Sequence, residues 1–271
     1  MLQSQIIAEL GVKPSVDYDA ELESRVGFLA EYLKHTRAKG YVLGISGGVD
    51  STLGGKLAQL AVERVRKLGE QAEFIAVRLP HHLQHDEADA QAALEFIRPD
   101  RNVTFNIGSA ADAMEAEYLH AVGVNISDFN KGNIKARLRM TAQYALAGDP
   151  GMLVVGTDHA AEAVTGFYTK FGDGGADVTP LSGLNKRQIR GFVEFLGGSP
   201  ALAGKVPTAD LLDDNPGRTD EDELGLRYDD IDDYLEGKTV PAEVSARIEQ
   251  YFLRSRHKRT TPVTPMDQWW K

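Results

Sequence analysis

The sequence contains no cysteine among its 271 residues. This absence excludes disulfide bonds, thiolate metal sites and a cysteine nucleophile. No apolar run approaches the roughly 20 residues that a membrane-spanning helix needs. The first ten residues, MLQSQIIAEL, lack the basic segment and apolar core of a secretory signal. We therefore expect a soluble, cytoplasmic protein.

Positive charge is also scarce. The chain has 30 Lys and Arg against 40 Asp and Glu, which gives a formal net charge of -10 and a pI near 5.2. Because nucleic acids bind mainly through Lys and Arg that neutralise phosphates, DNA or RNA is disfavoured as the main ligand. Apolar residues make up 42% of the chain, an ordinary share for a globular protein with a buried core.

Short apolar runs rich in β-branched residues alternate with helical patterns over the first 157 residues. Strands are predicted at 41–45, 73–79, 102–107 and 151–157. Helices are predicted at 21–37, 51–68, 86–97, 109–121 and 127–147. This alternation predicts an α/β fold with a parallel sheet whose strands are buried on both faces.

The composition of the sequence changes after residue 157. The segment GFYTKFGDGGADVTPLSGLN is polar and rich in glycine, which predicts a long functional loop. Further helices are predicted at 185–197, 221–235 and 241–256. We expect residues 1–271 to form one domain with helical and loop additions.

The stretch YVLGISGGVDSTLGGKLAQL, residues 41–60, places a glycine turn between the first strand and a helix. Gly47 and Gly48 allow backbone amides to approach anionic oxygens, and the helix dipole favours negative charge there. The turn carries an acid, Asp50, and lacks the Gly-Lys-Ser/Thr ending of the common P-loop. A simple tight turn with Asp50 or Ser51 as helix N-cap is the structural alternative. The whole pattern favours phosphate binding.

The hexapeptide SGGVDS resembles the signature of the N-type ATP pyrophosphatases, which cleave ATP between the α and β phosphates. Other segments resemble successive motifs of the ammonia-dependent NAD synthetases in that superfamily: RLPHHLQHDEADAQ, NKGNIKARLRMTAQYALAG, VVGTDHAAEAVTGFYTKFGDGGADVTPLSGLNKRQIR, KVPTADL, DELGLRYDDIDDYLEG and SRHKRTTPVTP. The resemblance implies a Rossmann-like three-layer α/β/α fold of the adenine nucleotide alpha-hydrolase type, with extra C-terminal helices.

The same resemblance implies the reaction. A member of this family is a ligase that amidates deamido-NAD with ammonia, through an adenylated intermediate, and releases NAD, AMP and diphosphate. Such enzymes use Mg²⁺, form homodimers and need no protein nucleophile, which agrees with the absence of any Ser-His-Asp or Cys-His set. Relatives that use glutamine carry a further domain with a catalytic cysteine. This chain has no cysteine, so we expect it to use free ammonia or ammonia from a separate chain.

Site residues follow from the matched motifs. The resemblance implies Mg²⁺ ligands at Asp50 and Glu162. It implies ATP contacts at Gly44, Ile45, Ser46, Gly47, Gly48, Val49, Asp50, Ser51, Arg78, Gln84, Thr157, Lys186 and Thr208. It implies deamido-NAD contacts at Arg137, Lys170, Asp177, His257 and Lys258.

Each of these residues also has a structural interpretation. Glu162 reads as a solvated acid in the first turn of a helix that begins near Asp158, and Lys186 as an exposed helix cation. Arg137 competes with Arg139, because residues two apart do not share a helix face. Thr157 is an N-cap candidate, and Thr208 is a candidate turn residue. The loop with Lys170 and Asp177 could be a disordered segment, and His257-Lys258 could be a generic basic helix end.

Several features leave alternatives open. The remaining histidines, His35, His81, His82, His85, His120 and His159, show no metal-ligand spacing, so we predict no zinc site and read HHLQH as loop. Lids over the adenylate are expected at 80–87 and 203–225. Dimer contacts are expected from Tyr32, Phe129, Met140 and Tyr144. A different pyrophosphate-releasing enzyme, such as a tRNA thiolase or purine amidotransferase subunit, and a non-catalytic nucleotide sensor are the competing functions.

Overall fold

The computed structural model describes residues 2–82, 87–207 and 217–270. These residues contain a sheet of four parallel strands in the order β3-β2-β1-β4. The strands are β1 Gly40–Gly44, β2 Glu73–Arg78, β3 Arg101–Thr104 and β4 Leu153–Val154. In the centre of the sheet, Tyr41 pairs with Phe74 on one side and with Leu153 on the other. The predicted α/β fold with a parallel sheet is confirmed.

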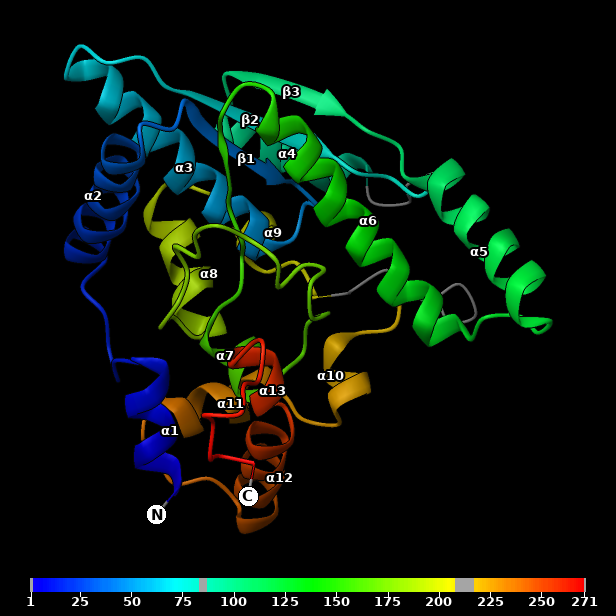
Figure 1. Ribbon diagram of the computed structural model, residues 1–271. Coiled ribbons are helices and arrows are strands. Elements are labelled where there is room, and N and C mark those ends of the chain that lie inside the picture. The colour runs from blue at the N-terminus through cyan, green and yellow to red at the C-terminus, as the bar shows by residue number, and fades with distance from the viewer. Residues whose placement is uncertain (1, 83–86, 208–216, 271) are drawn as a thin grey trace.

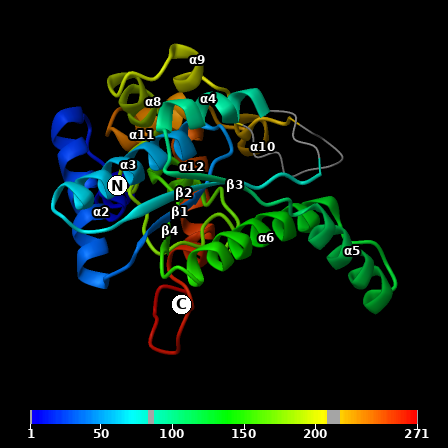
Figure 2. The ribbon, with the colours of Figure 1, turned by 90° about the horizontal axis from the view of Figure 1, so that it is seen from above.

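Helices cover both faces of this sheet (Figures 1 and 2). One face carries α2 Tyr18–Thr36, α3 Val49–Lys67, α4 Glu87–Ile97 and α8 Lys186–Phe195, and the other carries α6 Asp128–Gly148. Side chains alternate between the faces, as strand geometry requires. Leu43 and Phe74 belong to the core under α3, whereas Val42 and Ile75 belong to the core under α6. The fold therefore has the three layers that were expected.

A second core lies beyond the carboxyl ends of the strands (Figure 1). Helices from distant parts of the chain meet in this core: α1 Leu2–Leu10, α7 Ala160–Thr165, α10 Asp220–Leu224, α11 Tyr228–Leu235 and α12 Ala242–Arg254. The short α13 Arg256–Arg259 follows α12. Ile6, Val164, Ile231 and Phe252 are buried in the second core. The extra C-terminal helices were predicted, but α1 was not. No helix of the described residues has the length and apolar character to cross a membrane.

The remaining helices are α5 Gly108–Val122, which packs on α6 and projects from the body of the molecule, and the short α9 Pro200–Ala203. The segment 166–185 is irregular apart from one bridge between Val155 and Val178, as the glycine-rich composition predicted. It packs beside β4 at the edge of the sheet.

Three predicted elements differ from the structure. The strand expected at 102–107 is the edge strand β3, and its side chains are mostly exposed because it has a described neighbour on one side alone. The strand expected at 151–157 shortens to β4, because the chain after Val154 pairs with the irregular segment, through the bridge of Val155 with Val178 and the bond from the Gly156 amide to the Val178 carbonyl. The helix expected at 221–235 is two helices, α10 and α11, because Gly225 adopts a φ of 60° and ends the first.

Candidate active site

A cavity of about 280 Å³ opens at the carboxyl ends of β1 and β4. Parallel sheets place ligands at this edge, where loops meet helix N-termini. Gly44 and Ile45 line it from the end of β1, and Thr157 lines it from the segment after β4. Arg139 and other residues of α6 and the segment 205–207 complete the walls.

The glycine turn is held in shape by its two serines. Ser46 Oγ accepts from the amide of Gly48 at 3.2 Å, and Ser51 Oγ donates to the carbonyl of Gly48 at 3.1 Å. Gly47 has a φ of 84°, a conformation that glycine adopts without strain. Gly48 is the N-cap of α3 and has no side chain, so the first-turn amides receive no side-chain acceptor. The suggestion that Asp50 or Ser51 is the N-cap is therefore wrong, and the helix start offers amides to an anion.

Four charged or titratable side chains meet beside this turn. Lys186 Nζ lies 2.9 Å from Asp50 Oδ2 and 3.7 Å from Glu162 Oε1. His159 Nε2 lies 3.4 Å from Asp50 Oδ1 and 3.3 Å from Glu162 Oε1. The Lys186 and His159 side chains are fully buried, while 19% of the Asp50 side chain and 18% of the Glu162 side chain stay exposed toward the cavity. The two carboxylates thus face the cavity with cations behind them.

The charges of this cluster support one another. Burial acts to raise the pKa of Asp50, but the positive charges of Lys186 and His159 outweigh burial, and the pKa lies below its ordinary value. Burial acts to lower the pKa of Lys186, but the charges of Asp50 and Glu162 raise it above its ordinary value. The Asp50 carboxylate is therefore ionised and the Lys186 ammonium protonated at neutral pH.

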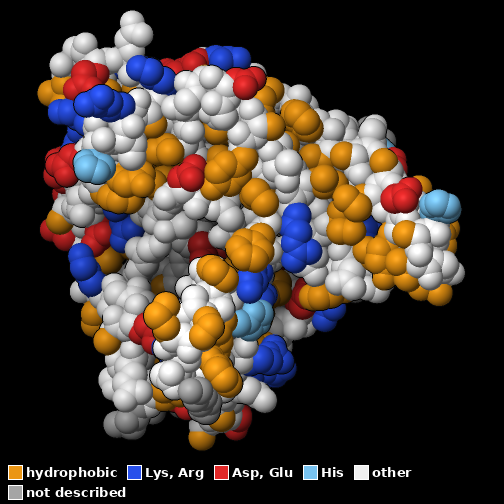
Figure 3. Space-filling model, in the orientation of Figure 1, with side chains coloured by type: hydrophobic (Ala, Val, Ile, Leu, Met, Phe, Trp, Pro, Cys, Tyr) orange, Lys and Arg blue, Asp and Glu red, His pale blue; other side chains and the backbone are white. Residues whose placement is uncertain are grey.

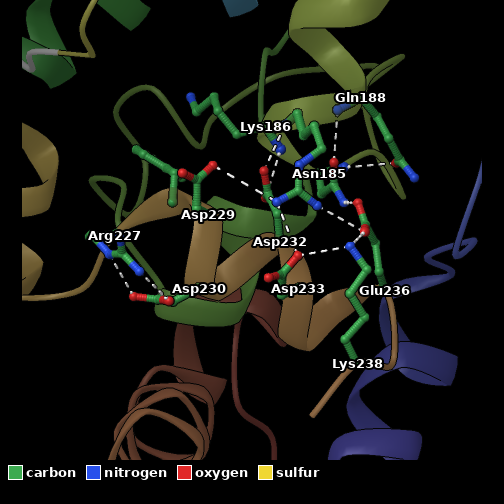
Figure 4. A network of polar contacts seen from close by, with 12 residues as sticks. Asn185, Lys186, Gln188, Arg227, Asp229, Asp230, Asp232, Asp233, Glu236 and Lys238 are labelled. Atoms are coloured by element: carbon green, nitrogen blue, oxygen red, sulfur yellow. Dashed lines mark hydrogen bonds and ion pairs between the residues drawn. The ribbon is translucent and has the colours of Figure 1, made fainter. Parts of the chain in front are cut away.

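Lys186 reaches Asp50 because α8 begins at that residue. Asn185 and Gln188 form a capping box at the helix start. Asp232 of α11 accepts from the backbone amides of Lys186 at 3.1 Å and Arg187 at 2.7 Å. Figure 4 shows this part of the network, in which Asn185 also donates to Glu236, the residue that follows α11. The start of α8 is thus tied to α11 by buried bonds, which fixes the direction of the lysine.

Further acids add negative potential around Glu162. Burial raises the pKa of Asp220 to about 6, and the charge of Glu162 contributes to that rise. Burial followed by the charge of Glu162 raises the pKa of Asp158 to about 7. Tyr228 donates to Asp220 at 3.0 Å, and its ring lies under the Lys186 ammonium at 4.7 Å from the centroid. An excess of carboxyl groups over cations of this kind favours a bound cation.

The residues expected to contact ATP divide into three groups. Those that line the cavity are Gly44, Ile45, Ser46, Gly48, Val49, Asp50, Ser51 and Thr157, together with Glu162. Gly47 and Lys186 lie directly behind them, whereas the Arg78 guanidinium lies 3.0 Å from the Glu87 carboxylate. Gln84 and Thr208 lie outside the described residues, as do parts of both expected lid segments.

A second cavity of about 140 Å³ adjoins the first, and Phe167 and Asp173 line both. Lys258 lines it and donates to the carbonyls of Gly166 at 2.8 Å and Tyr168 at 2.6 Å. Near the middle of the face in Figure 3, Lys, Arg and His side chains gather. Of the expected second-substrate residues, Lys258 contributes a basic group to the second cavity.

Four of the five residues expected to contact the second substrate come together here. Arg137 donates to the carbonyl of Lys170 at 3.3 Å. Burial, then the charges of Lys170 and Lys258, lower the pKa of the exposed His257. Asp177 lies apart at the end of β4, where it accepts from the Val154 amide and from Tyr144.

Sequence reasoning missed several residues of the site. His159 was grouped with histidines of no metal-ligand spacing, yet it lies between Asp50 and Glu162; its i,i+3 spacing from Glu162 was the available signal. Arg139 lines the cavity and donates to the Leu79 carbonyl at 3.0 Å. Gln143 accepts from the Gly44 amide at 2.7 Å and supports the end of β1.

Comparison of the sequence with known proteins shows the family of this chain. The sequence pattern of the NAD synthase family matches residues 21–262. The chain belongs to the NAD synthase family. An NH(3)-dependent NAD(+) synthetase of Bacillus velezensis is 60% identical over 270 residues, which cover 100% of this chain and 99% of the relative.

Two solved structures extend this relationship to the fold. The NAD+ synthetase of Burkholderia pseudomallei is 48% identical, with a TM-score of 0.83 over 96% of each chain. The NMN synthetase of Francisella tularensis is 34% identical, with a TM-score of 0.80 over 93% of this chain and 100% of the other.

Proposed function

We propose that this member of the NAD synthase family is an ammonia-dependent ligase that amidates deamido-NAD at the expense of ATP, the last step of NAD biosynthesis. The observation that carries the proposal is the pair Asp50 and Glu162, which faces a cavity directly beside an uncapped, glycine-lined helix start. The full-length similarity to ammonia-dependent synthetases supports the same reaction.

The donor set at this pair suits Mg²⁺. Both residues supply carboxylate oxygens, the ligands that Mg²⁺ prefers. Asp50 Oδ1 is buried and accepts no hydrogen bond from the described residues. We propose that Asp50 and Glu162 would hold Mg²⁺, and a bound ion there would supply positive charge for the departing diphosphate. His159 Nε2 lies 3.3 Å from Glu162 Oε1, behind the pair.

The protein's own groups align the reacting atoms. The amides of residues 47–51 and the Ser46 and Ser51 hydroxyls hold the ATP phosphates, and Lys186, which is paired with Asp50 beside the turn, adds positive charge for a phosphate oxygen. A carboxylate oxygen of the nicotinate group attacks the α-phosphorus, and the bond to the bridging oxygen breaks with release of diphosphate. Ammonia then attacks the acyl carbon, loses a proton, and displaces AMP.

The second cavity supports binding of deamido-NAD next to ATP. It shares Phe167 and Asp173 with the first cavity and is lined by Lys258, while Arg137, Lys170 and His257 lie around it. Cations at this place complement the diphosphate of a dinucleotide. Arg78, Thr157, Gln84 and Thr208 remain proposed ATP contacts, and Asp177 remains a proposed contact of deamido-NAD.

Ammonia enters as such, because the chain has no cysteine for a glutamine amidase reaction. A separate chain that supplies ammonia is compatible with the same site. We propose that residues 1–271 act as one domain, since α8 packs on the sheet and is bound by Asp232 of the second core. The substrates, ATP and a pyridine dinucleotide, support a cytoplasmic place of action.

We further propose a homodimer built on the arm of α5 and α6, over which hydrophobic side chains gather (Figure 3). Its exposed apolar residues include Met114, Leu119, Val122, Val124 and Phe129, with Phe129 exposed over 64% of its surface. Of the other expected dimer contacts, Tyr144 is exposed, Tyr32 packs against the core, and Met140 lines the cavity. A continuous apolar surface on a projecting arm is typical of an interface between subunits.

The assay contains ATP, Mg²⁺, ammonium and deamido-NAD, with NAD, AMP and diphosphate measured together. Equal amounts of the three products are expected. AMP and diphosphate without NAD would indicate another acceptor, such as that of a tRNA thiolase, and no turnover would indicate a sensor. Asp50→Ala is expected to lose activity, whereas Asp149→Ala, an exposed acid at the end of α6, is its control.

A second substrate has one observation in its favour. The 34% identical structure is named an NMN synthetase, so nicotinate mononucleotide must be tested beside deamido-NAD. We expect a higher kcat/KM with deamido-NAD, because the second cavity, which Lys258 lines, has a role with the larger substrate. A higher kcat/KM with the mononucleotide would reverse the assignment of the substrate and leave the chemistry unchanged.

A further inference from the structure

Three potential metal ligands lie together outside both cavities. His81 and His82 follow the end of β2, and Asp112 lies on α5. One donor atom from each lies within 4.8 Å of the other two. His82 Nε2 is 3.0 Å from Asp112 Oδ1, and the two imidazole rings have centroids 4.6 Å apart. None of the three lines the cavities proposed for the substrates.

The local backbone holds His82 in this place. Its φ of 58° lies in the left-handed region, which non-glycine residues seldom adopt. Asn106 fixes this conformation from both sides: Oδ1 accepts from the His82 amide at 3.2 Å, and Nδ2 donates to the His82 carbonyl at 3.0 Å. The position of the ring is therefore determined by hydrogen bonds to the main chain.

The start of α5 leaves room for that ring. An ideal Cβ at Gly108 would lie 2.6 Å from His82 Nδ1, so any larger residue there would push the imidazole away. Asp112 is four residues further along α5 and shares a helix face with Gly108. Gly108 therefore leaves space for the His82 ring, and the Asp112 carboxylate lies within hydrogen-bond distance of it.

We propose that His81, His82 and Asp112 form a binding site for a divalent transition metal of the Zn²⁺, Co²⁺ or Ni²⁺ type. Two imidazole nitrogens and one carboxylate oxygen are ligands that these ions take, with water in the open position. In a tetrahedral site with bonds of about 2.0–2.1 Å, neighbouring ligand atoms are about 3.3 Å apart. The hydrogen-bonded spacing of His82 and Asp112 is close to this value. Mg²⁺ prefers oxygen ligands and competes poorly here.

A metal at this place ties the exit of β2 to α5. The Pro80 carbonyl already accepts from the Ile107 amide at 2.9 Å, so the two segments are adjacent before the ion binds. Leu79, two residues before His81, lines the ATP cavity. The site is thus separate from Asp50 and Glu162 but close in sequence to the cavity wall.

The test uses protein freed of metal by a chelator, titrated with Zn²⁺ by equilibrium dialysis and with Co²⁺ by visible absorption. We expect one tight equivalent assigned to this cluster, and a loss of affinity of at least roughly tenfold in His82→Ala and in Asp112→Asn. His82 and Asp112 are half-exposed, so both variants are expected to keep the wild-type melting temperature. His120→Ala, on the same helix, is the matched control and keeps the affinity.

A second set of variants separates this site from the acid pair, where Asp50, His159 and Glu162 also lie within ligand distance of one another. Asp50→Ala is expected to retain the tight equivalent. Wild-type affinity in both His82→Ala and Asp112→Asn overturns the proposal. Loss of the tight equivalent in Asp50→Ala also overturns it, because the ion would then belong to the substrate cavity.

Discussion

The ammonium of Lys186 lies 2.9 Å from the carboxylate of Asp50, although 136 positions separate the two residues in the sequence. The glycine turn contains no lysine, and Lys186 at the start of α8 lies beside it instead. Because the Lys186 side chain is fully buried, water does not compete for this contact. The charge at the turn therefore depends on the correct placement of a distant helix.

Lys186→Met removes that charge. The proposed phosphate contact is lost, and Asp50 is left beside Glu162 without its nearest cation, so kcat/KM for ATP is expected to fall by about 10²–10³-fold. Steady-state kinetics with varied ATP measure the effect. Lys67→Met, an exposed lysine in the last turn of α3, is the control. Activity within a few-fold of wild type would contradict the proposed role of Lys186.

Asp232→Ala is expected to weaken both stability and activity. It leaves one buried and one partly buried amide at the start of α8 without their acceptor, which costs about 1–3 kcal/mol of unfolding free energy. Because Lys186 is the first residue of α8, kcat is expected to fall as well. Urea unfolding and kinetics on the same preparation measure the two effects.

Asp233→Ala, the neighbouring acid on α11, is the matched control for Asp232→Ala. Asp233 forms partly exposed ion pairs with Arg187 and Lys238, which are worth about 0–1 kcal/mol. Equal losses in the two variants would show that burial of the Asp232 bonds is unimportant.

Gly47→Ala tests the close packing of the turn. A Cβ there would lie 2.7 Å from the Ala90 amide nitrogen of α4, at a φ of 84°. Gly69 has a φ of 88° and open space around it, so Gly69→Ala reports backbone strain alone. We expect Gly47→Ala to lose about 1–3 kcal/mol more than Gly69→Ala, together with ATP binding. Thermal unfolding and ATP titration distinguish the two variants; equal behaviour would exclude the steric explanation.

Asp220→Asn tests how far ionisation of the buried Asp220 carboxyl lowers the free energy of unfolding. Burial raises the pKa of Asp220 from 3.8 to about 6 in the folded protein. The unfolded chain releases this proton first, so wild-type stability falls as pH rises from about 4 to about 6. The variant lacks this loss, and its stability relative to wild type is expected to increase over that range by at most about 3 kcal/mol.

Urea unfolding without ligands, near pH 4 and near pH 7, measures this pH effect. Glu223→Gln, an exposed acid on the same helix, is the control. A stability difference between Asp220→Asn and wild type that does not change with pH would contradict the raised pKa.

Local chemistry predicted the elements whose signals lie within a few residues. Val42 and Leu43 are apolar in succession, which indicates a strand buried on both faces, and the two faces do belong to different cores. The turn after β1 was located because its glycines and serines are contiguous. The break at Gly225 was missed because a glycine within a helical pattern is compatible with either a weak helix or a helix end.

Contacts between distant segments were beyond the reach of that reasoning. His159 enters the site through its place at the start of α7, and Asp112 meets His82 across 30 positions. Spacing pointed to the His159–Glu162 pair alone; the contacts of His159 with Asp50 and of Asp112 with His82 depend on how two elements pack. Family resemblance had already directed attention to Lys186 and Asp50, but the contact between them emerged from the fold.

Asp50 belongs to a helix of the sheet core, and Glu162 belongs to a helix of the second core. An ion and nucleotide held between them would bind only when both cores are folded and docked. Ligand binding would then raise the unfolding temperature of the two cores together and sharpen the transition, even where each core alone has unequal stability. The substrate would in this way be part of what makes the molecule unfold as one unit.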